Sequence, residues 1–361
     1  MANMVSSDFW QKRKVLVTGH TGFKGSWLCV LLDALGAEVH GLALQPPTQP
    51  NLFTLARIDA LLASDTRADI RDAEKVQACL QQVAPQTIFH LAAQPLVRQG
   101  YAAPVETYAV NVLGTAHVLD AVRNCSSVQS VVIATTDKCY ENREWIRPYR
   151  ETDNLGGHDP YSNSKACAEL VTQSFRDSFF ASPDSPRIAS ARAGNVIGGG
   201  DWAPDRLIPD CVRAWVQNES VTLRYPAAVR PWQHVLEPLT GYIMLAEALG
   251  ADNGVEFARA WNFGPALEDA SSVGDVAAAV CKQLRISLQM PIETPEQHEA
   301  GLLRLDSTQA QTRLGWQPRW HLERTLQETV AWYRHWHEGG DMLSFSREQI
   351  RHYQAGNQER N

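Results

Sequence analysis

The chain has 361 residues, of which 44% are hydrophobic and 20% are charged, and its formal net charge at pH 7 is −7. That length allows a large buried core, in one large domain or in two coupled domains. The negative charge argues against a nucleic-acid-binding protein, which needs a basic face to neutralise phosphates. The sequence contains no apolar run of about 18 residues and no signal-peptide core, so we expect no contact with a membrane.

The cysteines and histidines give no sign of a metal site. The seven cysteines are scattered along the chain, and none has the C-x-x-C spacing. That usage is typical of reduced thiols in the cytoplasm, rather than of a disulfide scaffold or a zinc site. The eleven histidines contain no H-E-x-x-H pattern. We therefore expect a cytoplasmic protein without a bound metal.

Short apolar runs alternate with helical patterns through the first half of the chain. The runs are "KVLVT" (14–18), "EVHGLAL" (38–44), "LLASDT" (61–66), "TIFHLAA" (87–93), "SVVIAT" (130–135) and "RIASARAGNV" (187–196). This alternation predicts an α/β fold with a doubly wound parallel sheet of the Rossmann type. We predict a dinucleotide-binding domain at residues 1–195 and a smaller substrate-binding lobe at residues 196–361, some segments of which return to the first domain.

A glycine-rich loop, "VTGHTGFKG" (17–25), directly follows the first run and opens a helical pattern. Its spacing is G-x-x-G-x-x-G, and a glycine triplet alone is weak evidence for a nucleotide site. Here the strand, the turn and the helix are all present, so the backbone can approach a pyrophosphate at the start of the helix. The expected cofactor contacts in the loop are Gly19, Thr21, Gly22, Phe23, Lys24 and Gly25.

The end of the second run lacks the residue that commonly holds an adenosine ribose. "GLALQPP" (41–47) offers no acidic residue for the ribose and no arginine for a 2′-phosphate, so it does not distinguish NAD from NADP. After the third run, "ADIRD" (68–72) places Asp69 beside Ile70 as candidate contacts with the adenine. The alternative role for Asp69 is to cap a helix, which Asp72 fits better.

Tyr161 and Lys165 lie four residues apart in "DPYSNSKACAEL" (159–170). On a helix they project from one face. An ammonium group beside a phenol lowers the pKa of the phenol, which can then take a proton from an alcohol while a nicotinamide takes a hydride. The alternative is an exposed helix face. Together with the glycine loop, the pair predicts a dehydrogenase-type site.

"TTDKCY" (135–140) places an acid and an amine directly after an apolar run that we expect to be a buried strand. Asp-Lys at such a position is usually a solvated turn. However, ligands in open α/β sheets bind at the carboxyl ends of strands. Thr136, Asp137 and Lys138 are therefore candidates for the chemistry.

With these motifs the chain resembles the extended short-chain dehydrogenase/reductases that act on nucleotide sugars. The resemblance covers nearly the whole chain, and three blocks are most similar to the dehydratases of CDP-linked sugars: "TTDKCY", "AGNVIGGGDW" (193–202) and "RPWQHV" (230–235). It implies a tightly held NAD and a nucleotide-sugar substrate. Such dehydratases oxidise carbon 4 of the sugar, remove water across carbons 5 and 6, and return the hydride to carbon 6.

The resemblance also implies a role for each catalytic candidate. Thr136 and Tyr161 would act in the oxidation, with Lys165 tuning the phenol and positioning the nicotinamide ribose. Asp137 would be the acid for the leaving hydroxyl. Lys138 stands where many relatives carry Glu, and it would be the base at carbon 5 if burial and positive charge lower its pKa. It could instead stabilise an enolate, with Glu141 or a water as the base.

Further binding residues are expected from their motif positions. The cofactor would also contact Leu91, Ala92 and Ala93, in addition to Tyr161 and Lys165. Arg230 matches an arginine that contacts the substrate pyrophosphate in this family, and a guanidinium binds phosphate through two parallel bonds. The full set of expected substrate contacts is Gln94, Asn195, Arg206, Arg230, His234 and Asn262. None of these motifs identifies a residue that recognises the cytosine.

Two alternative functions share part of this pattern. A nucleotide-sugar 4-epimerase has the same loop and Tyr–Lys pair, but it needs no acid and base after the strand. A non-catalytic dinucleotide-sensing module would need neither feature. Asp137 and Lys138 therefore favour a dehydratase, which we expect to act as a homo-oligomer.

Overall fold

Seven parallel strands form the central sheet. The computed structural model describes residues 6–223, 225–289 and 301–356. The strands lie in the order β11-β6-β5-β4-β1-β2-β3, and every neighbouring pair is parallel. This arrangement confirms the predicted Rossmann-type sheet. The bounds are β1 (Lys14–Thr18), β2 (Glu38–Ala43), β3 (Ser64–Arg67), β4 (Thr87–His90), β5 (Ser130–Ala134), β6 (Arg187–Ala193) and β11 (Ala260–Phe263).

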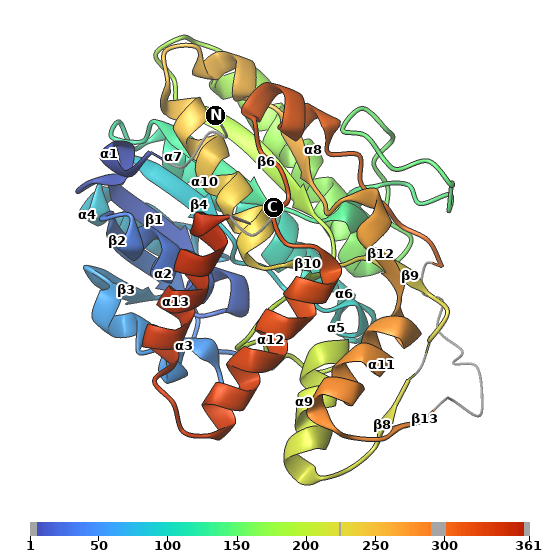
Figure 1. The fold of residues 1–361 in the computed structure, drawn as a ribbon. Coiled ribbons are helices and arrows are strands. Elements are labelled where there is room, and N and C mark those ends of the chain that lie inside the picture. Colours follow the sequence, from blue (N-terminus) through green and yellow to red (C-terminus); the bar gives the residue numbers. More distant parts are fainter. Residues whose placement is uncertain (1–5, 224, 290–300, 357–361) are drawn as a thin grey trace.

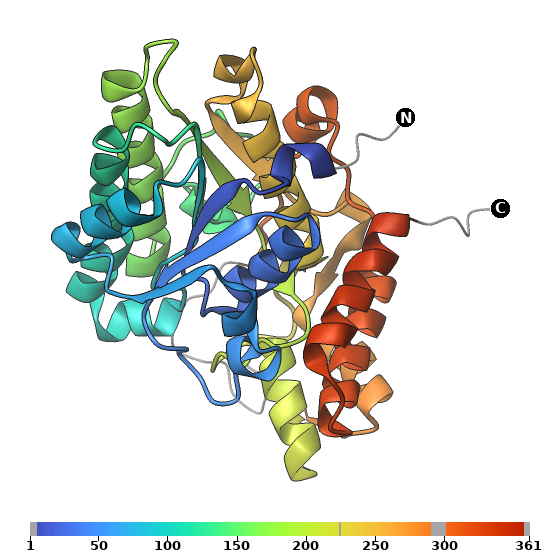
Figure 2. The same cartoon turned by 90° about the vertical axis from the view of Figure 1, so that its left-hand side faces the viewer.

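Helices cover both faces of the sheet. In β1, Val15 and Val17 face one side and Leu16 the other, because successive side chains in a strand point to opposite faces. Two helices pack on the first side, α2 (Phe23–Ala34) and α10 (Leu236–Gly250). Three pack on the other side: α4 (Ala73–Val83), α7 (Gly114–Arg123) and α8 (Pro160–Phe179). Figure 2 shows the strands between cyan and green helices on the left and gold and red helices on the right.

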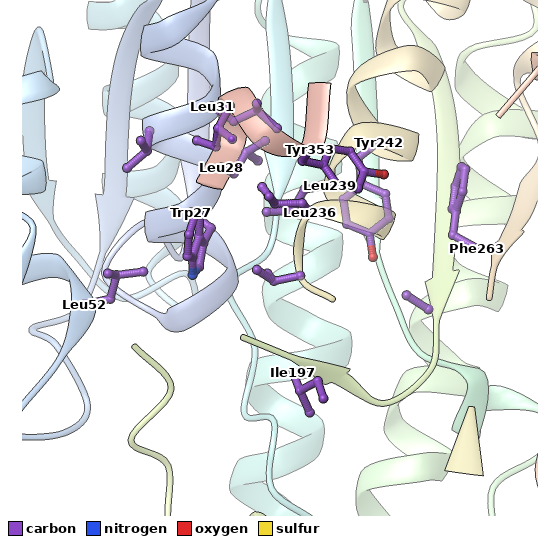
Figure 3. Close-up of a cluster of buried hydrophobic side chains, with 14 of the residues drawn as sticks. Trp27, Leu28, Leu31, Leu52, Ile197, Leu236, Leu239, Tyr242, Phe263 and Tyr353 are labelled. Atoms are coloured by element: carbon purple, nitrogen blue, oxygen red, sulfur yellow. The ribbon is translucent and has the colours of Figure 1, made fainter. Parts of the chain in front are cut away.

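The core around α2 and α10 also includes the end of the chain. Figure 3 shows side chains of these two helices packed with Tyr353, which belongs to α13 (Met342–Ala355). Trp27 of α2 and Tyr242 of α10 are completely buried there. α12 (Leu322–His337) packs on α13, and α13 packs on α2. Late segments of the chain therefore complete the core beside the first helix of the sheet.

A smaller group of elements lies at the lower end of the molecule in Figure 1, where α9 (Leu207–Gln217) packs on α11 (Val273–Leu284). Three short pairings accompany it: β7 (Val196–Ile197) with β10 (Gln233–His234), β8 (Val221–Thr222) with β13 (Leu288–Gln289), and β9 (Val229–Pro231) with β12 (Ala270–Ser272). The remaining helical segments are α1 (Ser7–Trp10), α3 (Leu52–Leu55), α5 (Val97–Ala102), α6 (Pro104–Tyr108) and the short turns Ile58–Leu61, Ala109–Leu113, Asp137–Cys139, Gly254–Phe257, Leu267–Asp269 and Ala310–Leu314.

Side-chain caps fix where two of the helices begin. Asp159 caps α8, because its carboxylate accepts a hydrogen bond from the backbone N–H of Ser162 at 3.0 Å, and Pro160 occupies the first helical position. Asp72 caps α4 by accepting from the N–H of Lys75 at 3.1 Å. The second cap confirms the interpretation of Asp72 made from the sequence.

Three features of the described residues bear on the chemistry of the protein. All seven cysteines are free. Across the residues that the structure describes, no helix is long and apolar enough to cross a membrane. The same residues contain no group of three or more His, Cys, Asp or Glu side chains that could hold a metal ion.

Candidate active site

The glycine loop between β1 and α2 is packed too closely for other residues at two positions. Gly19 has φ +76°, and a Cβ there would lie 2.6 Å from the backbone nitrogen of Ala92. A Cβ on Gly25 would lie 2.1 Å from the carbonyl oxygen of Gly19. Gly22 differs, since the atom nearest to its Cβ would be 3.4 Å away. It begins α2 without a side-chain cap, so the helix N-terminus is open to a phosphate. The loop therefore fits a dinucleotide.

The other loop residues tie the turn to distant parts of the chain. Thr21 donates from its hydroxyl to the carbonyl oxygen of Leu44, at the end of β2, at 3.0 Å. Phe23 lies near Gly198, whose Cβ would be 3.3 Å from the ring. Lys24 donates from Nζ to the Tyr242 hydroxyl at 3.0 Å. Burial, with the nearby positive charges of Lys165 and Arg206, lowers the pKa of Lys24 to about 7. Lys24 thus belongs to the same charged site as Lys165.

The carboxyl end of β2 has an arginine beside it that comes from β3. Arg67 pairs in register with Ala43, and its Nη1 donates to the Leu44 carbonyl oxygen at 2.9 Å. Its Nη2 lies 2.6 Å from Oδ2 of Asp65. The other carboxylate oxygen of Asp65, Oδ1, lies 2.9 Å from Nε2 of His20. Asp65 therefore neutralises the charge of Arg67, which lies at the carboxyl end of β2, the position at which Rossmann-type proteins commonly hold the adenosine ribose.

The candidate adenine contacts Asp69 and Ile70 follow β3, and the other expected cofactor contacts Leu91, Ala92 and Ala93 follow β4. Asp69 is paired with Arg71, with Nη2 to Oδ2 at 2.6 Å, and that arginine lowers the pKa of the Asp69 carboxyl. Ile70 is buried against Gly114, whose Cβ would lie 2.5 Å from it. Leu91 continues β4 by donating its N–H to the Thr18 carbonyl oxygen at 3.1 Å. The segment Leu91, Ala92 and Ala93 therefore runs beside the glycine loop.

Tyr161 and Lys165 are both buried on one face of α8, at the end of β5. Lys165 donates from Nζ to the Ala134 carbonyl oxygen at 3.3 Å. Burial lowers the pKa of Lys165 to about 8. Burial also raises the pKa of Tyr161 to about 12, although a hydrogen bond with Thr136 and the charge of Arg206 oppose this. Thr136, Tyr161 and Lys165 therefore meet at one place, as the sequence predicts.

Asp137 and Lys138 belong to a short turn, Asp137–Cys139, that follows the end of β5 after two intervening residues. The Thr136 hydroxyl caps this turn and donates to Oδ1 of Asp137 at 3.0 Å. Oδ2 of Asp137 is buried and has no hydrogen-bond partner among the described residues. A Cβ on Gly194 would lie only 3.1 Å from that oxygen. A buried carboxyl oxygen without a partner is costly, which suits a group that binds a ligand.

Three of the six expected substrate residues, Arg206, Arg230 and Gln94, make side-chain hydrogen bonds or ion pairs, and only Arg206 is shown to act on Tyr161. Arg206 is paired with Asp201 at 2.8 Å, and its charge acts on Tyr161. Arg230 donates from Nη1 to the Val229 carbonyl oxygen at 3.0 Å. Asn195 is half-buried in the segment before β7. Gln94 donates from Nε2 to a threonine hydroxyl on α6 at 2.9 Å.

His234 and Asn262 are instead packed inside the protein. Neither side chain has exposed surface. The ring of His234 lies between Trp27 and Trp320, with centroids 6.1 and 4.8 Å away, and burial lowers its pKa to about 3. Asn262 accepts from the Tyr140 hydroxyl at 2.7 Å and donates to two backbone carbonyls. A substrate contact for either residue therefore rests on motif position alone.

Comparison with known proteins identifies the family. The family model described as GDP-mannose 4,6 dehydratase matches residues 16–329. The chain belongs to this family. CDP-glucose 4,6-dehydratase of Salmonella typhimurium is 48% identical to it, over 98% of this chain and 99% of that protein.

Solved structures of similar proteins share the fold. A UDP-glucose 4-epimerase of Stenotrophomonas maltophila with bound NAD has a TM-score of 0.79 and 22% identity, and covers 91% of this chain and 100% of its own. A dTDP-glucose 4,6-dehydratase double mutant of Streptomyces venezuelae with NAD has a TM-score of 0.75 and 23% identity, and covers 91% and 99%. An epimerase and a dehydratase thus share the fold of this chain, so the fold alone does not decide between the two activities.

In this member of the GDP-mannose 4,6-dehydratase family, sequence reasoning missed three polar residues near the site. Tyr242 binds Lys24 but is 218 residues away in the chain. Arg67 reaches the end of β2 from the next strand. Glu169 lies one helical turn beyond Lys165, and its charge raises the pKa of Lys165 against the effect of burial. Only Glu169 gave a local signal, because it continues the four-residue spacing of Tyr161 and Lys165.

Proposed function

We propose that this protein is an NAD-dependent CDP-glucose 4,6-dehydratase, which forms CDP-4-keto-6-deoxyglucose and water. One observation supports this most directly. An acid with a buried, unpartnered oxygen, Asp137, lies beside the Tyr161–Lys165 pair at the end of β5. The choice of CDP-glucose rests on the 48% identity, over nearly both whole chains, to a protein of that activity.

The glycine loop and Lys165 would hold the cofactor. Gly19 and Gly25 keep the turn close to α2, and the open N-terminus of α2 would bind the pyrophosphate. Lys165 would bind the nicotinamide ribose. When bound, NAD supplies the hydride acceptor for carbon 4 and the hydride donor for carbon 6.

In the first step, Oη of Tyr161 would take the proton from the hydroxyl on carbon 4. The positive charge of Arg206 and a hydrogen bond with Thr136 favour the phenolate. The ammonium of Lys165, one helical turn along α8, would act in the same sense. Tyr161 and Lys165 are both buried, so the proton that Tyr161 takes would be kept away from solvent in this step. The new ketone acidifies the proton on carbon 5.

In the elimination, Nζ of Lys138 would take the proton from carbon 5 while Asp137 gives a proton to the hydroxyl on carbon 6, which leaves as water. The proton that Tyr161 takes from the carbon 4 hydroxyl would replace the one that Asp137 gives to the leaving water. As the hydride returns to carbon 6, the protonated base or solvent would give a proton back to carbon 5. The alternative base, Glu141, is 46% exposed and is bound to Arg143 at 3.0 Å, so its carboxylate is directed to the surface. This arrangement argues against Glu141 as the base. Lys138 is itself 30% exposed and lies 3.9 Å from Oδ1 of Asp137, so it is not deeply buried, as a lysine base is expected to be. The substitutions Lys138→Ala and Lys138→Arg decide between Lys138 as the base and Lys138 as an enolate stabiliser with a water as the base.

A panel of substrates tests the proposal. The protein is incubated with CDP-, dTDP-, UDP- and GDP-linked glucose and catalytic NAD, and the 4-keto sugar is followed by its ultraviolet absorbance in base. We expect product from CDP-glucose at a far higher kcat/KM than from the other three. An epimerase would form no 4-keto product and would give the galacto-configured sugar instead.

Two broader expectations accompany this function. The seven free thiols suit a reducing compartment, so we place the enzyme in the cytoplasm. A homo-oligomer is expected, and sedimentation at several protein concentrations would measure its size. A strictly monomeric enzyme would contradict that expectation without affecting the chemistry.

A further inference from the structure

Glu169 is a buried carboxylate that the proposed reaction does not use. It lies on α8, one turn beyond Lys165 and two turns beyond Tyr161, and its residue is only 3% exposed. Glutamates are almost never so deeply buried unless they are paired. Its role must therefore be sought in its partners.

The carboxylate of Glu169 accepts hydrogen bonds from three side chains. Oε1 accepts from the hydroxyl of Thr135, the residue that follows β5. Oε2 accepts from the Ser190 hydroxyl at 2.7 Å and from Nη2 of Arg192 at 2.8 Å. Each of these donors comes from a strand or a strand end of the central sheet, so the carboxylate is fixed from one side by the sheet.

Arg192 continues the network to the other side of the acid–base turn. It is 3% exposed and forms an ion pair with Glu169. Its Nη1 donates to the hydroxyl of Tyr140 at 2.8 Å and to the carbonyl oxygen of Glu151 at 3.2 Å. The Tyr140 hydroxyl in turn donates to Oδ1 of Asn262 at 2.7 Å.

The two ends of the segment 135–140 are therefore held by the two halves of one buried ion pair. Thr135 is bound by Glu169 and Tyr140 is bound by Arg192, while the residues between them are the candidate acid and base. We propose that the Glu169–Arg192 ion pair is a positioning device for this segment. The inference rests on the proposed dehydration, in which Asp137 and Lys138 act together on one sugar.

Physical chemistry supports a positioning role more than a stabilising one. Burying an ion pair usually contributes little net stability compared with apolar side chains of similar size. Charge-assisted hydrogen bonds are, however, short and directional, so they fix the groups they bind. Reacting groups need such placement, since a displacement of about 1 Å can reduce turnover by about 10²-fold.

The network also explains why Asn262 is buried. Its side chain completes the hydrogen bonding of Tyr140 and binds the carbonyl oxygens of Tyr149 at 2.9 Å and Asp306 at 3.1 Å. Asn262 is thus the outer anchor of the same network. The motif position that made Asn262 a substrate candidate is thus accounted for by its hydrogen bond with Tyr140, the last residue of the segment 135–140.

The first test removes one hydrogen bond without breaking the ion pair. Thr135→Val loses the hydroxyl that binds Glu169, whereas Thr135→Ser keeps it. For the valine variant we expect kcat to fall by about 10²-fold with KM for CDP-glucose nearly unchanged, and for the serine variant a return to near wild-type turnover. The matched control is Thr172→Val, which removes a buried hydroxyl on α8 that binds only the Ala168 carbonyl oxygen.

The second test does not depend on catalysis. Amide hydrogen exchange of the segment 135–140 is compared between the wild type, Glu169→Gln and Tyr140→Phe, all as full chains. The amide of Cys139 is bound to the Thr136 carbonyl oxygen at 3.3 Å and that of Tyr140 to the Asp137 carbonyl oxygen at 3.5 Å. We expect both amides to exchange faster in the two variants, and to be unaffected by Thr172→Val.

The outcomes separate this inference from the proposed function. Unchanged exchange in Glu169→Gln would show that the ion pair does not hold the segment. Faster exchange with wild-type kcat in Thr135→Val would show that the restraint has no part in turnover. A wild type that forms no 4-keto sugar would refute the dehydration, and the exchange comparison would still decide whether Glu169 holds the segment.

Discussion

Nζ of Lys138 lies 3.9 Å from Oδ1 of Asp137, and the two side chains differ sharply in exposure, at 30% and 1%. The amine can exchange its protons with water, whereas the acid is enclosed by the protein. In the proposed reaction, a proton that Lys138 takes from carbon 5 should therefore be replaced by one from solvent. The pair thus combines an enclosed acid with a base that is open to water.

The role of Lys138 is tested by two substitutions. Lys138→Ala removes both the amine and its charge, while Lys138→Arg keeps the charge but cannot act as a base, because a guanidinium stays protonated in proteins. If Lys138 is the base, both variants should lose about 10²–10⁴-fold in product formation. Exchange of the carbon 5 proton with heavy water should be lost in both, as measured by nuclear magnetic resonance. Persistent exchange in Lys138→Arg would identify Lys138 as an enolate stabiliser instead.

Asp137→Asn should block the loss of water but not the earlier proton removal. Asparagine has the same shape but no acidic proton for the leaving hydroxyl. We expect product formation to fall by about 10²–10⁴-fold, while the carbon 5 proton still exchanges with heavy water. Asp72→Asn is the control, since asparagine caps a helix about as well as aspartate. Normal dehydration by Asp137→Asn would show that the turn after β5 has no catalytic role.

Turnover should decline at alkaline pH because of Lys165. Burial lowers the pKa of Lys165 to about 8, so its ammonium form is present below that pH and is lost as the pH rises through it. Without that charge the Tyr161 phenol, whose pKa burial raises to about 12, is harder to ionise. The pH profile of kcat should therefore fall above about pH 8. A kcat that keeps rising to pH 10 would contradict this role of Lys165. The variant Tyr161→Phe, which lacks the phenol, should lose activity at every pH.

Gly22→Ala should weaken NAD binding without changing the fold. The added Cβ would lie 3.4 Å from the nearest atom, so the free energy of unfolding should stay close to that of the wild type. It would stand at the open start of α2, where the pyrophosphate is expected, and we expect about a tenfold loss of NAD affinity, equivalent to about 1.4 kcal/mol. Thermal unfolding and NAD titration measure the two effects.

Gly25→Ala is the contrasting variant for that experiment. Its Cβ would lie 2.1 Å from the Gly19 carbonyl oxygen, so the turn itself must shift and stability should fall. If Gly22→Ala binds NAD as tightly as the wild type, the pyrophosphate does not lie at the start of α2, which would contradict the proposed cofactor site.

The sheet could be predicted because its signals are local. The run at residues 14–18 coincides with β1, since a strand buried on both faces is apolar throughout. Asp72 was assigned as a cap from its own neighbours, and it caps α4. The third apolar run agrees less well with the structure. The run starts at residue 61, whereas β3 is Ser64–Arg67 and Leu61 ends the turn before it. Apolar content alone does not separate a short helical turn from a strand.

The site could be predicted only in part because some of its contacts join distant residues. The spacing of Tyr161 and Lys165 is local, and the structure brings them to Thr136 as expected. His234 and Asn262 occupy motif positions near the site, yet both are buried by residues far away in the chain, such as Trp320 and Tyr140. A motif shows where a residue lies along the chain, but not which way its side chain faces.

The most direct test of the proposed dehydration follows a single atom. CDP-glucose labelled with deuterium at carbon 4 is incubated with the wild-type protein and catalytic NAD, and the product is examined by mass spectrometry and nuclear magnetic resonance. We expect the deuterium at carbon 6 of a CDP-linked 4-keto-6-deoxy sugar, with solvent hydrogen at carbon 5. Deuterium that remains at carbon 4 of an epimerised sugar, or that accumulates in free NADH, would contradict the account.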